Sequence, residues 1–392
     1  MKKFKKILLI IIMIITLIFA FIGITSIIVI SDLVRTPKET LSAITTYKLI
    51  ASQYYDTVNK KKLIEGVSRG MADSLNDPYS TYYTKKEIAD FNSQLNGEYA
   101  GIGMLLGYDK ETQLVKGIRI FKDSPAFKGG LLAGDIIVEI DGKSTKGMDT
   151  EKVATTVKGK VGSKVKLVIF RKDKYLEFEL TREIVKVPTV SAQFVTSDTL
   201  YIEVTSFSES TAQEFRTMLS SLEKEPKKII LDLRNNGGGL VYQAIELARY
   251  FTPGGVVLYE TNRDRDKLIP LSADNPIFFN IPIVVLVNEN SASASEILAG
   301  AIQDYKTGTL IGNTTFGKAV VQTVFPLPTG GALKLTTQRY LTPKKRDINK
   351  VGLTPDIVKI MTVEDYEKMD YSALPDIKND LQLVEAINYL NK

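Results

Sequence analysis

Two apolar segments, each followed by a short turn and an amphipathic helix, constrain the fold of this chain most strongly. The first, KKIILDL at 227–233, precedes three glycines and the helical pattern LVYQAIELARYF. The second, IPIVVLVNE at 281–289, precedes a helix that we expect to begin near Ser293. Strands without polar alternation are typically buried on both faces of a parallel sheet. The pattern therefore predicts an α/β layer in the second half of the chain.

The preceding part of the chain, 97–182, consists of short β-rich runs separated by glycine. Five runs have the composition of strands: GIGMLL, QLVKGIRIF, GDIIVEIDG, SKVKLVIF and KYLEFELT. A short helix is expected at 149–158, with Val153 and Val157 facing inward. These features predict a small independent module.

Helices are predicted on both sides of these two parts, over 38–95 and in the tail from about 362. The first region carries an apolar stripe of Leu63, Val67, Met71 and Leu75, ended by Asn-Asp-Pro at 76–78. Such a stripe is a packing face, either within its own domain or against another subunit.

The N-terminus has the pattern of a membrane anchor. The 24 residues at 7–30 carry no charge and follow four lysines, and about 20 apolar residues suffice to cross a bilayer. The positive-inside rule then predicts a single-pass protein with a cytoplasmic N-terminus and an extracytoplasmic remainder. The alternative is secretion after cleavage, but signal peptides usually have a shorter apolar region of about 7–15 residues and an Ala-x-Ala-like site.

Composition limits the remaining function classes. Of the formal net charge of +6, those four lysines supply +4, and no basic stripe interleaved with aromatic residues follows, which argues against nucleic-acid binding. The chain has no histidine and no cysteine, which removes the usual base of serine hydrolases, the thiol nucleophile and most zinc sites. We expect no metal and no cofactor, and a serine nucleophile would need lysine as its base.

The candidate nucleophile lies in SASASE at 291–296. Ser293 and Glu296 have capping-box spacing, so a purely structural interpretation is strong. The position nevertheless favours function, because ligands bind where the strands of an α/β sheet end and helices begin. The alanines at 292 and 294 leave room for a substrate backbone.

The candidate base is Lys318, in FGKAVVQ at 316–322. Most lysines are solvated, and burial would have to lower the pKa from about 10.4 to about 7 or 8. Gln322 would orient the amine only if the chain bends, because residues i and i+4 lie about 13 Å apart on a straight strand. A phosphate-binding pattern, G-x-x-x-x-G-K from Gly312, is the alternative. It lacks the hydroxyl after Lys318 and the following helix.

The glycine run at 237–239 also has two interpretations. Glycines permit a strand-to-helix turn with unusual dihedral angles. They also let a substrate carbonyl approach backbone N–H groups, as in an oxyanion hole.

Together these motifs resemble the C-terminal processing peptidases, a subfamily of peptidase family S41 whose members are PDZ-containing serine peptidases with a Ser-Lys dyad. The matching segments are DPYSTYYTKKE at 77–87, YAGIGM at 99–104, LDLRNNGGG at 231–239, VLVNENSASASEILAGA at 285–301, FGKAVVQ at 316–322 and VGLTPDI at 351–357. The resemblance implies a multidomain α+β protein with a crotonase-like (ClpP/crotonase-type) α/β protease core and an inserted PDZ β-barrel-like domain. The expected parts are a basic stub at 1–6, a transmembrane helix at 7–30, a helical region at 31–96, the PDZ domain at 97–182, the core at 183–361 and a helical end at 362–392.

The resemblance also implies roles for individual residues. It assigns Ser293 as the nucleophile, Lys318 as the base and Gln322 as the amide that supports the base. The backbone N–H groups of Gly239 and Ala294 would form the oxyanion hole.

The resemblance also bears on three residues next to these. Ser291 and Ser295 would then have local structural roles. Ala319 departs from the glycine of many relatives and restricts the bend that Lys318 needs.

By the same resemblance, the PDZ domain would bind substrates with apolar C-termini by adding the peptide as a strand. The expected carboxylate loop and groove residues are Gly101, Ile102, Gly103, Met104, Val153 and Val157. The helical ends imply a homodimer, and a peptide in the PDZ groove is expected to shift the core towards an active state. The alternative function is a catalytically silent PDZ scaffold that only binds peptides.

Overall fold

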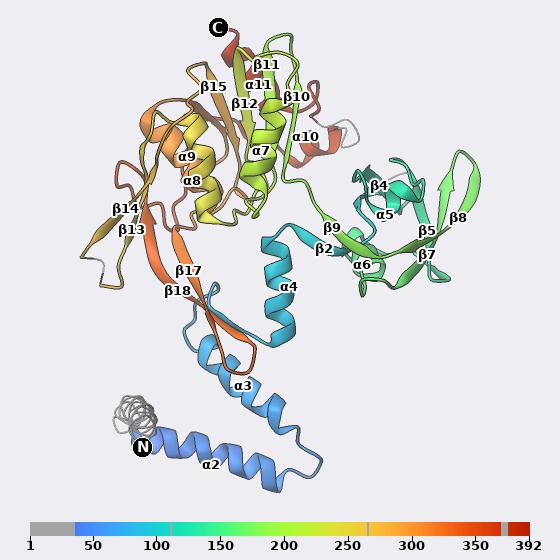
Figure 1. Cartoon of the computed structure of the whole chain (residues 1–392), viewed down its shortest axis with the longest axis vertical. Helices are drawn as coiled ribbons and strands as arrows, with labels where there is room; N and C mark the ends of the chain where they lie inside the picture. Colours follow the sequence, from blue (N-terminus) through green and yellow to red (C-terminus); the bar gives the residue numbers. More distant parts are fainter. Residues whose placement is uncertain (1–35, 110–111, 265, 370–374) are drawn as a thin grey trace, which may run out of the picture. The chain divides into compact units, whose positions relative to one another are not determined.

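The computed structural model describes residues 36–109, 112–264, 266–369 and 375–392 (Figure 1). The chain forms two compact units, divided between Asn76 and Asp77. The predicted anchor at 7–30 lies outside the described residues. Within the described ranges, no helix is both long and apolar enough to cross a membrane.

In the described part of the first unit, 36–76, the chain forms helices α2 (Pro37–Gln53) and α3 (Lys60–Asp73). Pro37 occupies the first turn of α2, and the Asn59 side chain caps α3 by accepting a hydrogen bond from the N–H of Lys62 at 3.1 Å. The predicted apolar stripe stays largely uncovered within this unit, because Val67 and Met71 are 41% and 66% exposed.

The second unit begins with a strand where the sequence predicted helix. Strand β1 (Thr81–Tyr83) pairs antiparallel with β18 (Ala332–Leu341), and its central residue Tyr82 is buried. Helix α4 (Lys85–Leu95) follows, and a reciprocal capping box between Thr84 and Glu87 starts it. The prediction of helix throughout 38–95 is therefore wrong at 81–83, because pairing with a distant strand overrides local propensity.

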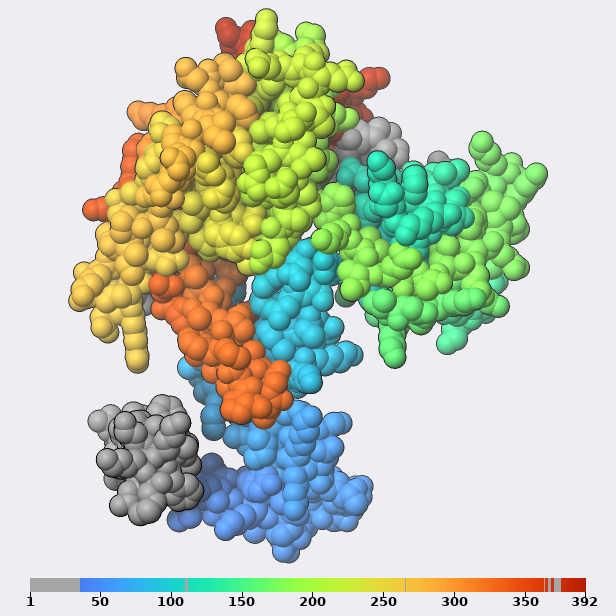
Figure 2. Space-filling view, in the orientation of Figure 1, coloured from blue at the N-terminus to red at the C-terminus, as the bar shows by residue number. Residues whose placement is uncertain are grey.

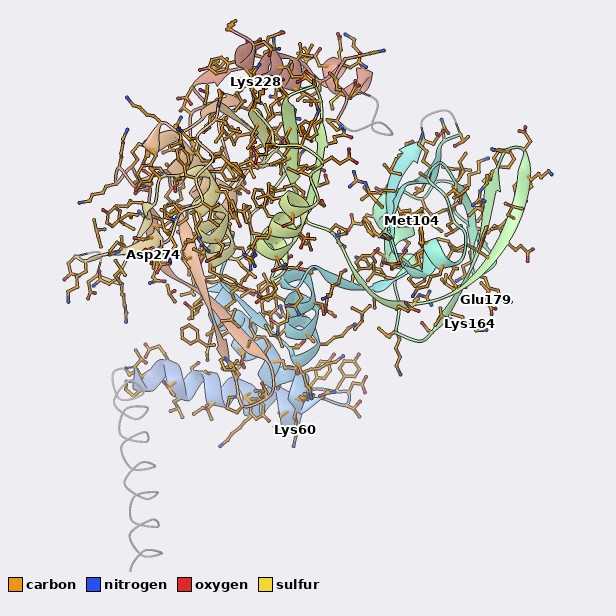
Figure 3. The ribbon with its side chains drawn as sticks, turned by 45° about the horizontal axis from the view of Figure 1, so that its top comes forward. Lys60, Met104, Lys164, Glu179, Lys228 and Asp274 are labelled. Carbon is orange, nitrogen blue, oxygen red and sulfur yellow. The ribbon has the colours of Figure 1, made fainter. Side chains whose placement is uncertain are left out.

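The next part is a β-rich module whose strands follow the order β3-β4-β5-β7-β8, with β6 paired to β5. The five predicted strands and the predicted helix are confirmed. Their bounds are β3 (Met104–Asp109), β4 (Leu114–Ile120), α5 (Pro125–Lys128), β5 (Ile136–Ile140), β6 (Lys143–Ser144), α6 (Thr150–Val157), β7 (Lys164–Arg171) and β8 (Lys174–Thr181). Val153 and Val157 belong to the module's core, as their inward orientation predicted. Lys164 and Glu179 form an ion pair between β7 and β8 (Figure 3).

A two-stranded ribbon carries the chain into and out of this module. Strand β2 (Glu98–Gly101) pairs antiparallel with β9 (Glu183–Lys186). The two ends of the inserted segment therefore lie side by side.

The rest of the second unit is built on a six-stranded sheet in the order β10-β11-β12-β15-β16-β19, parallel except for β10. Helices cover both faces (Figure 1). The strand and helix bounds are β10 (Val190–Phe194), β11 (Thr199–Val204), α7 (Thr211–Ser220), β12 (Lys228–Asp232), α8 (Val241–Phe251), β15 (Ile283–Val287), α9 (Ala294–Tyr305), β16 (Thr309–Gly312), β19 (Ile357–Val358), α10 (Val363–Lys368) and α11 (Leu381–Leu390).

The two central strands explain the apolar segments of the sequence. In β12, Ile229 and Leu231 pack in the cluster that contains residues of α7, α8 and α9, whereas Ile230 packs with residues of α11 on the other face. Strand β15 is buried at every position. The predicted α/β layer with doubly covered strands is confirmed.

A second sheet carries a hairpin beside this layer. Its order is β1-β18-β13-β14, and β17 pairs antiparallel with residues 332–339 of β18. The new bounds are β13 (Gly255–Thr261), β14 (Leu268–Ala273) and β17 (Val320–Pro326). The hairpin of β17 and β18 extends outward in the space-filling view (Figure 2, orange), and Phe325 near its tip is exposed.

Candidate active site

The glycine run and the serine motif meet at one edge of the core sheet. Strands β12 and β15 are parallel neighbours, with Asp232 opposite Leu286, so the loops after them leave the sheet at the same end. The N–H of Ala292 donates to the carbonyl of Asn236 at 3.0 Å, which joins the two loops directly.

The outer serines of the motif tie these loops together. Ser291 Oγ donates to the carbonyl of Leu233, and Ser295 Oγ donates to the carbonyl of Asn236, both at 2.8 Å. Both serines are completely buried. Their hydroxyls have structural partners, and Ser293 lies between them in the sequence.

Ser293 adopts an uncommon backbone conformation at the start of α9. Its φ is 57° and its ψ is −115°, a region that costs a residue with a side chain about 1–3 kcal/mol. The N–H of Ser293 donates to Glu296 Oε2 at 2.9 Å, so the carboxylate side of the predicted capping box is present. The Ser293 side chain is 9% exposed.

Gly238 and Gly239 allow the glycine loop to approach this turn. A Cβ at Gly238 would lie 2.8 Å from Ser293 Cβ and 2.9 Å from Ala294 N, and its φ is +98°. Gly239 has φ +144°, and a Cβ there would collide with the Phe207 carbonyl. Only glycine fits at either position.

Two backbone N–H groups at this contact have no acceptor within the described part of the chain. They belong to Gly239, whose neighbours bond to Phe207, and to Ala294, the first residue of α9. Free donors next to a serine can bind a negatively charged oxygen. These are the two positions to which the family resemblance assigns the oxyanion hole.

The Glu296 carboxylate connects the serine turn to the segment that carries Lys318. Glu296 is completely buried, and each of its oxygens accepts two hydrogen bonds. The donors to Oε1 are the Thr315 hydroxyl at 2.5 Å and the Gly317 N–H at 2.7 Å, and those to Oε2 are the N–H groups of Lys318 at 2.8 Å and Ser293 at 2.9 Å. The carboxylate thus fixes the backbones of Ser293 and Lys318 to one another.

Tyr340, on β18, forms a second bridge between the same two residues. Its hydroxyl oxygen lies 2.9 Å from the Lys318 carbonyl and 3.2 Å from the Ser293 carbonyl. Burial, together with the Glu296 carboxylate, raises the pKa of Tyr340 well above its ordinary value, so the hydroxyl remains a donor. The sequence did not single out Tyr340, since no local pattern marks a tyrosine on a distant strand.

The Lys318 side chain is half-buried. Burial, and secondarily the nearby Lys334 ammonium, lower the pKa of Lys318, while the Asp77 and Glu296 carboxylates oppose the decrease. Lys318 Nζ lies 4.6 Å from the centroid of the Tyr79 ring. Within the described residues, no hydrogen bond joins Lys318 Nζ to Ser293 Oγ.

Gln322 is directed elsewhere. It lies on β17 at an irregularity between Val321 and Gln322, and its Nε2 donates to Thr336 Oγ1 at 3.4 Å. Lys318 precedes the strand, in the loop at 313–319. No hydrogen bond between Gln322 and Lys318 is found among the described residues. The segment after Lys318 is a strand, which does not fit a phosphate-binding loop followed by a helix.

The β-rich module carries a groove of about 580 Å³. Its lining includes Gly101, Ile102, Met104 and Val157, and Met104 is marked at the start of β3 in Figure 3. Gly103 has φ +82°, as a turn into β3 requires.

The lining differs from the assignment by resemblance: Val153 and Gly103 are not lining residues, whereas Ala154 and Tyr99 are. Val153 is completely buried in the module's core and does not line the groove, whereas its neighbour Ala154 does. Tyr99 also lines the groove, with its ring packed over Gly101.

No group of three or more His, Cys, Asp or Glu residues in the described ranges is arranged to hold a metal ion. The expectation that the protein needs no metal and no cofactor stays a prediction from the sequence.

Comparisons with known proteins match three parts of the chain. Residues 198–359 match the model of peptidase family S41, residues 120–171 match the PDZ domain, and residues 32–87 match the N-terminal domain of the activating protease CtpB.

Similar proteins cover most of the chain. The carboxy-terminal processing protease CtpA of Bacillus subtilis is 36% identical over 328 residues, covering 83% of this chain and 69% of the relative. The carboxy-terminal-processing protease of Bartonella bacilliformis is 37% identical over 320 residues, covering 80% and 73%. A solved S41 protease from Bacteroides fragilis shares the fold, with a TM-score of 0.57, 17% identity, and coverage of 81% of this chain and 87% of that one. The chain therefore belongs to the carboxy-terminal processing proteases of peptidase family S41 and carries a PDZ domain.

Proposed function

We propose that this protein is a membrane-anchored serine endopeptidase with a Ser-Lys dyad. One observation carries the proposal: Glu296 and Tyr340 hold the backbones of Ser293 and Lys318 together. The free N–H groups of Gly239 and Ala294 lie at the same turn. The lowered pKa of Lys318, caused first by burial, supports its role as the base.

In the proposed reaction, Ser293 Oγ attacks the carbonyl carbon of the scissile bond and its proton moves to the neutral Lys318 amine. The N–H groups of Gly239 and Ala294 donate hydrogen bonds to the oxyanion. Lys318 then gives the proton to the leaving amine nitrogen as the C–N bond breaks, which leaves an acyl ester on Ser293. Water attacks this ester with Lys318 as base, releasing the new carboxyl terminus and restoring the serine. Gln322 orients the neutral lysine after turning away from Thr336.

Substrate recognition is assigned to the PDZ groove. Its lining by Ile102, Met104 and Val157 suits an apolar C-terminal side chain, and a peptide would add as a strand beside β3. The names of the Bacillus and Bartonella relatives give the same substrate end, a protein C-terminus. We propose protein or peptide substrates with apolar C-termini.

The same proposal includes a crotonase-like fold for the core, an anchor at 7–30 that places the core outside the cytoplasm, and a homodimer. The uncharged run behind four lysines supports the anchor. The exposed apolar residues of α2 and α3 support a partner for the first unit.

The test is proteolysis of casein, or of a peptide with an apolar C-terminus, by residues 31–392. Ser293→Ala and Lys318→Ala are each expected to lower kcat at least about 1,000-fold, because each removes a group that acts only together with the other. Ser220→Ala and Lys344→Ala, at exposed positions, are the matched controls and should keep wild-type activity.

Activity that survives both Ser293→Ala and Lys318→Ala would overturn the dyad. A wild type that binds C-terminal peptides but never cleaves them would instead establish the alternative function, a peptide-binding scaffold.

A further inference from the structure

The turn at 77–80, between the first unit and β1, is fixed onto strand β18, which pairs with the strand that follows Lys318. Asp77 Oδ1 accepts a hydrogen bond from the Tyr79 N–H at 3.1 Å, and Asp77 Oδ2 accepts one from the Ser80 hydroxyl at 2.5 Å. Ser80 Oγ in turn accepts the N–H of Thr336, on β18, at 3.0 Å. Burial opposes ionisation of Asp77, but these hydrogen bonds keep its pKa below the ordinary value. The turn therefore has a defined position and a charged carboxylate.

Two of the proposed catalytic side chains are held by this arrangement. Lys318 Nζ lies 4.6 Å from the Tyr79 ring centroid, within the distance of about 6 Å at which a cation and a ring attract. Gln322 donates to Thr336, the residue whose backbone also holds Ser80. Lys318 thus contacts the turn itself, through Tyr79, whereas Gln322 contacts Thr336, to which the turn is bound.

The contact with Tyr79 favours one form of the lysine. The negative face of an aromatic ring attracts an ammonium group and gains little from a neutral amine. The Asp77 and Glu296 carboxylates act in the same direction, whereas burial and the Lys334 ammonium act against it. A protonated lysine cannot take a proton from a serine.

We propose that Tyr79 is a positioning residue that holds Lys318 in a resting, protonated state, and that the 77–80 turn must release it before Ser293 can be activated. The proposal rests on the proposed function, which gives Lys318 its role as base. It adds a role for a segment outside the α/β layer, and it explains why Gln322 and Lys318 are apart while Ser293 and Lys318 share two backbone bridges.

The direct test measures protonation of Lys318 without relying on catalysis. The purified full-length chain, kept in detergent, is labelled with a trace of acetic anhydride over a range of pH, and mass spectrometry reports the labelling midpoint of Lys318. Tyr79→Leu keeps an apolar side chain but removes the ring, so the midpoint should fall by about one pH unit. Tyr79→Phe keeps the ring and should retain the wild-type midpoint.

Tyr259→Leu is the matched control, because it removes a ring that faces Lys345 Nζ at 5.4 Å instead of Lys318. It should leave the Lys318 midpoint unchanged. Thermal unfolding of each variant shows whether it is folded. If Tyr79→Leu does not fold, Tyr79→Trp, which retains a ring, is the informative variant. The labelling midpoint of Lys318 in Tyr79→Trp should not fall below that of the wild type.

The proposal is overturned if Tyr79→Leu has the wild-type midpoint, if Tyr79→Phe shifts as far as Tyr79→Leu, or if Tyr79→Trp lowers the midpoint. Peptide cleavage provides the second measurement. The acid limb of kcat/KM should move to lower pH in Tyr79→Leu together with the labelling midpoint. A shifted midpoint in a chain that never cleaves peptide supports the contact with Tyr79 and refutes the proposed function, so the two failures are distinguishable.

Discussion

The conformation of Ser293 is maintained by its immediate neighbours. Its left-handed φ of 57° is unfavourable for a residue with a side chain. Compensation comes from hydrogen bonds at both ends of the residue: the N–H donates to Glu296, and the carbonyl accepts from Ile297 N at 2.9 Å. The same turn leaves room for Gly238 only because that residue has no Cβ. The proposed nucleophile can adopt this geometry because Gly238 has no Cβ that would collide with the turn.

A Gly238→Ala substitution should therefore strongly lower activity, although it adds only one methyl group. The new Cβ would meet Ala292 O, Ser293 Cβ and Ala294 N at 2.7–2.9 Å, and a φ of +98° adds strain. Displacing the serine turn by a fraction of an ångström should lower kcat about 100-fold, and the left-handed alanine should reduce the free energy of unfolding by about 1–2 kcal/mol. Peptide hydrolysis and urea unfolding measure the two effects.

The control is the adjacent glycine. A Cβ at Gly237 would have nothing within 4 Å. Gly237→Ala should keep activity and stability close to the wild type. Equal losses in both variants would mean that loop flexibility matters, and not the contact with Ser293.

At the scale of elements, the PDZ groove lies between α6 and the strand β3. Helix α6 turns Val153 into the module's core and Ala154 towards the groove. One position along a helix rotates a side chain by about 100°, so an inward-facing pattern in the sequence does not distinguish core from groove. The observed position of β3 was therefore needed to correct the assignment of Val153 to the groove.

Ala154→Glu is expected to weaken binding of a peptide with an apolar C-terminus at least about tenfold, because the carboxylate would lose water when the peptide enters. Fluorescence anisotropy with a labelled peptide measures the change in Kd. Thr155→Glu adds the same charge at the next, exposed position of α6 and should bind like the wild type. If Ala154→Glu and Thr155→Glu had the same Kd for the peptide, the peptide would not bind in this groove.

How far the sequence predicts these elements depends on the range of the interactions that stabilise them. Strand β15 and helix α9 follow from apolar runs and a local cap, and both were predicted correctly. Strand β1 was missed because its pairing partner β18 lies about 250 positions later. The approach of Gly238 to Ser293 and the contact of Tyr79 with Lys318 are likewise long-range. The motifs identified Ser293 and Lys318 as candidates, but no pattern in the chain specified Glu296 as the bridge between them.

At the scale of the whole molecule, the first unit leaves apolar side chains uncovered. Met71 on α3 is 66% exposed and Leu41 on α2 is 64% exposed. Exposed residues of this kind commonly belong to an interface. The proposed homodimer would cover them.

Met71→Glu should therefore convert a dimer into a monomer, because burying an unpaired carboxylate costs several kcal/mol. Sedimentation velocity of residues 31–392 measures the state. Lys60→Glu changes an exposed, charged position of α3 (Figure 3) and should sediment like the wild type. A wild type that sediments as a monomer at all concentrations would contradict the homodimer.

The ribbon formed by β2 and β9 holds the two ends of the PDZ domain next to each other. Its register ends with Gly101 opposite Glu183, so the chain enters and leaves the module through paired backbone. A folded module whose own ends lie close together can be inserted at such a place with little loss of loop-closure entropy. If the PDZ groove selects substrates as proposed, exchanging the module between these two strands would change the range of substrates without altering the residues around Ser293.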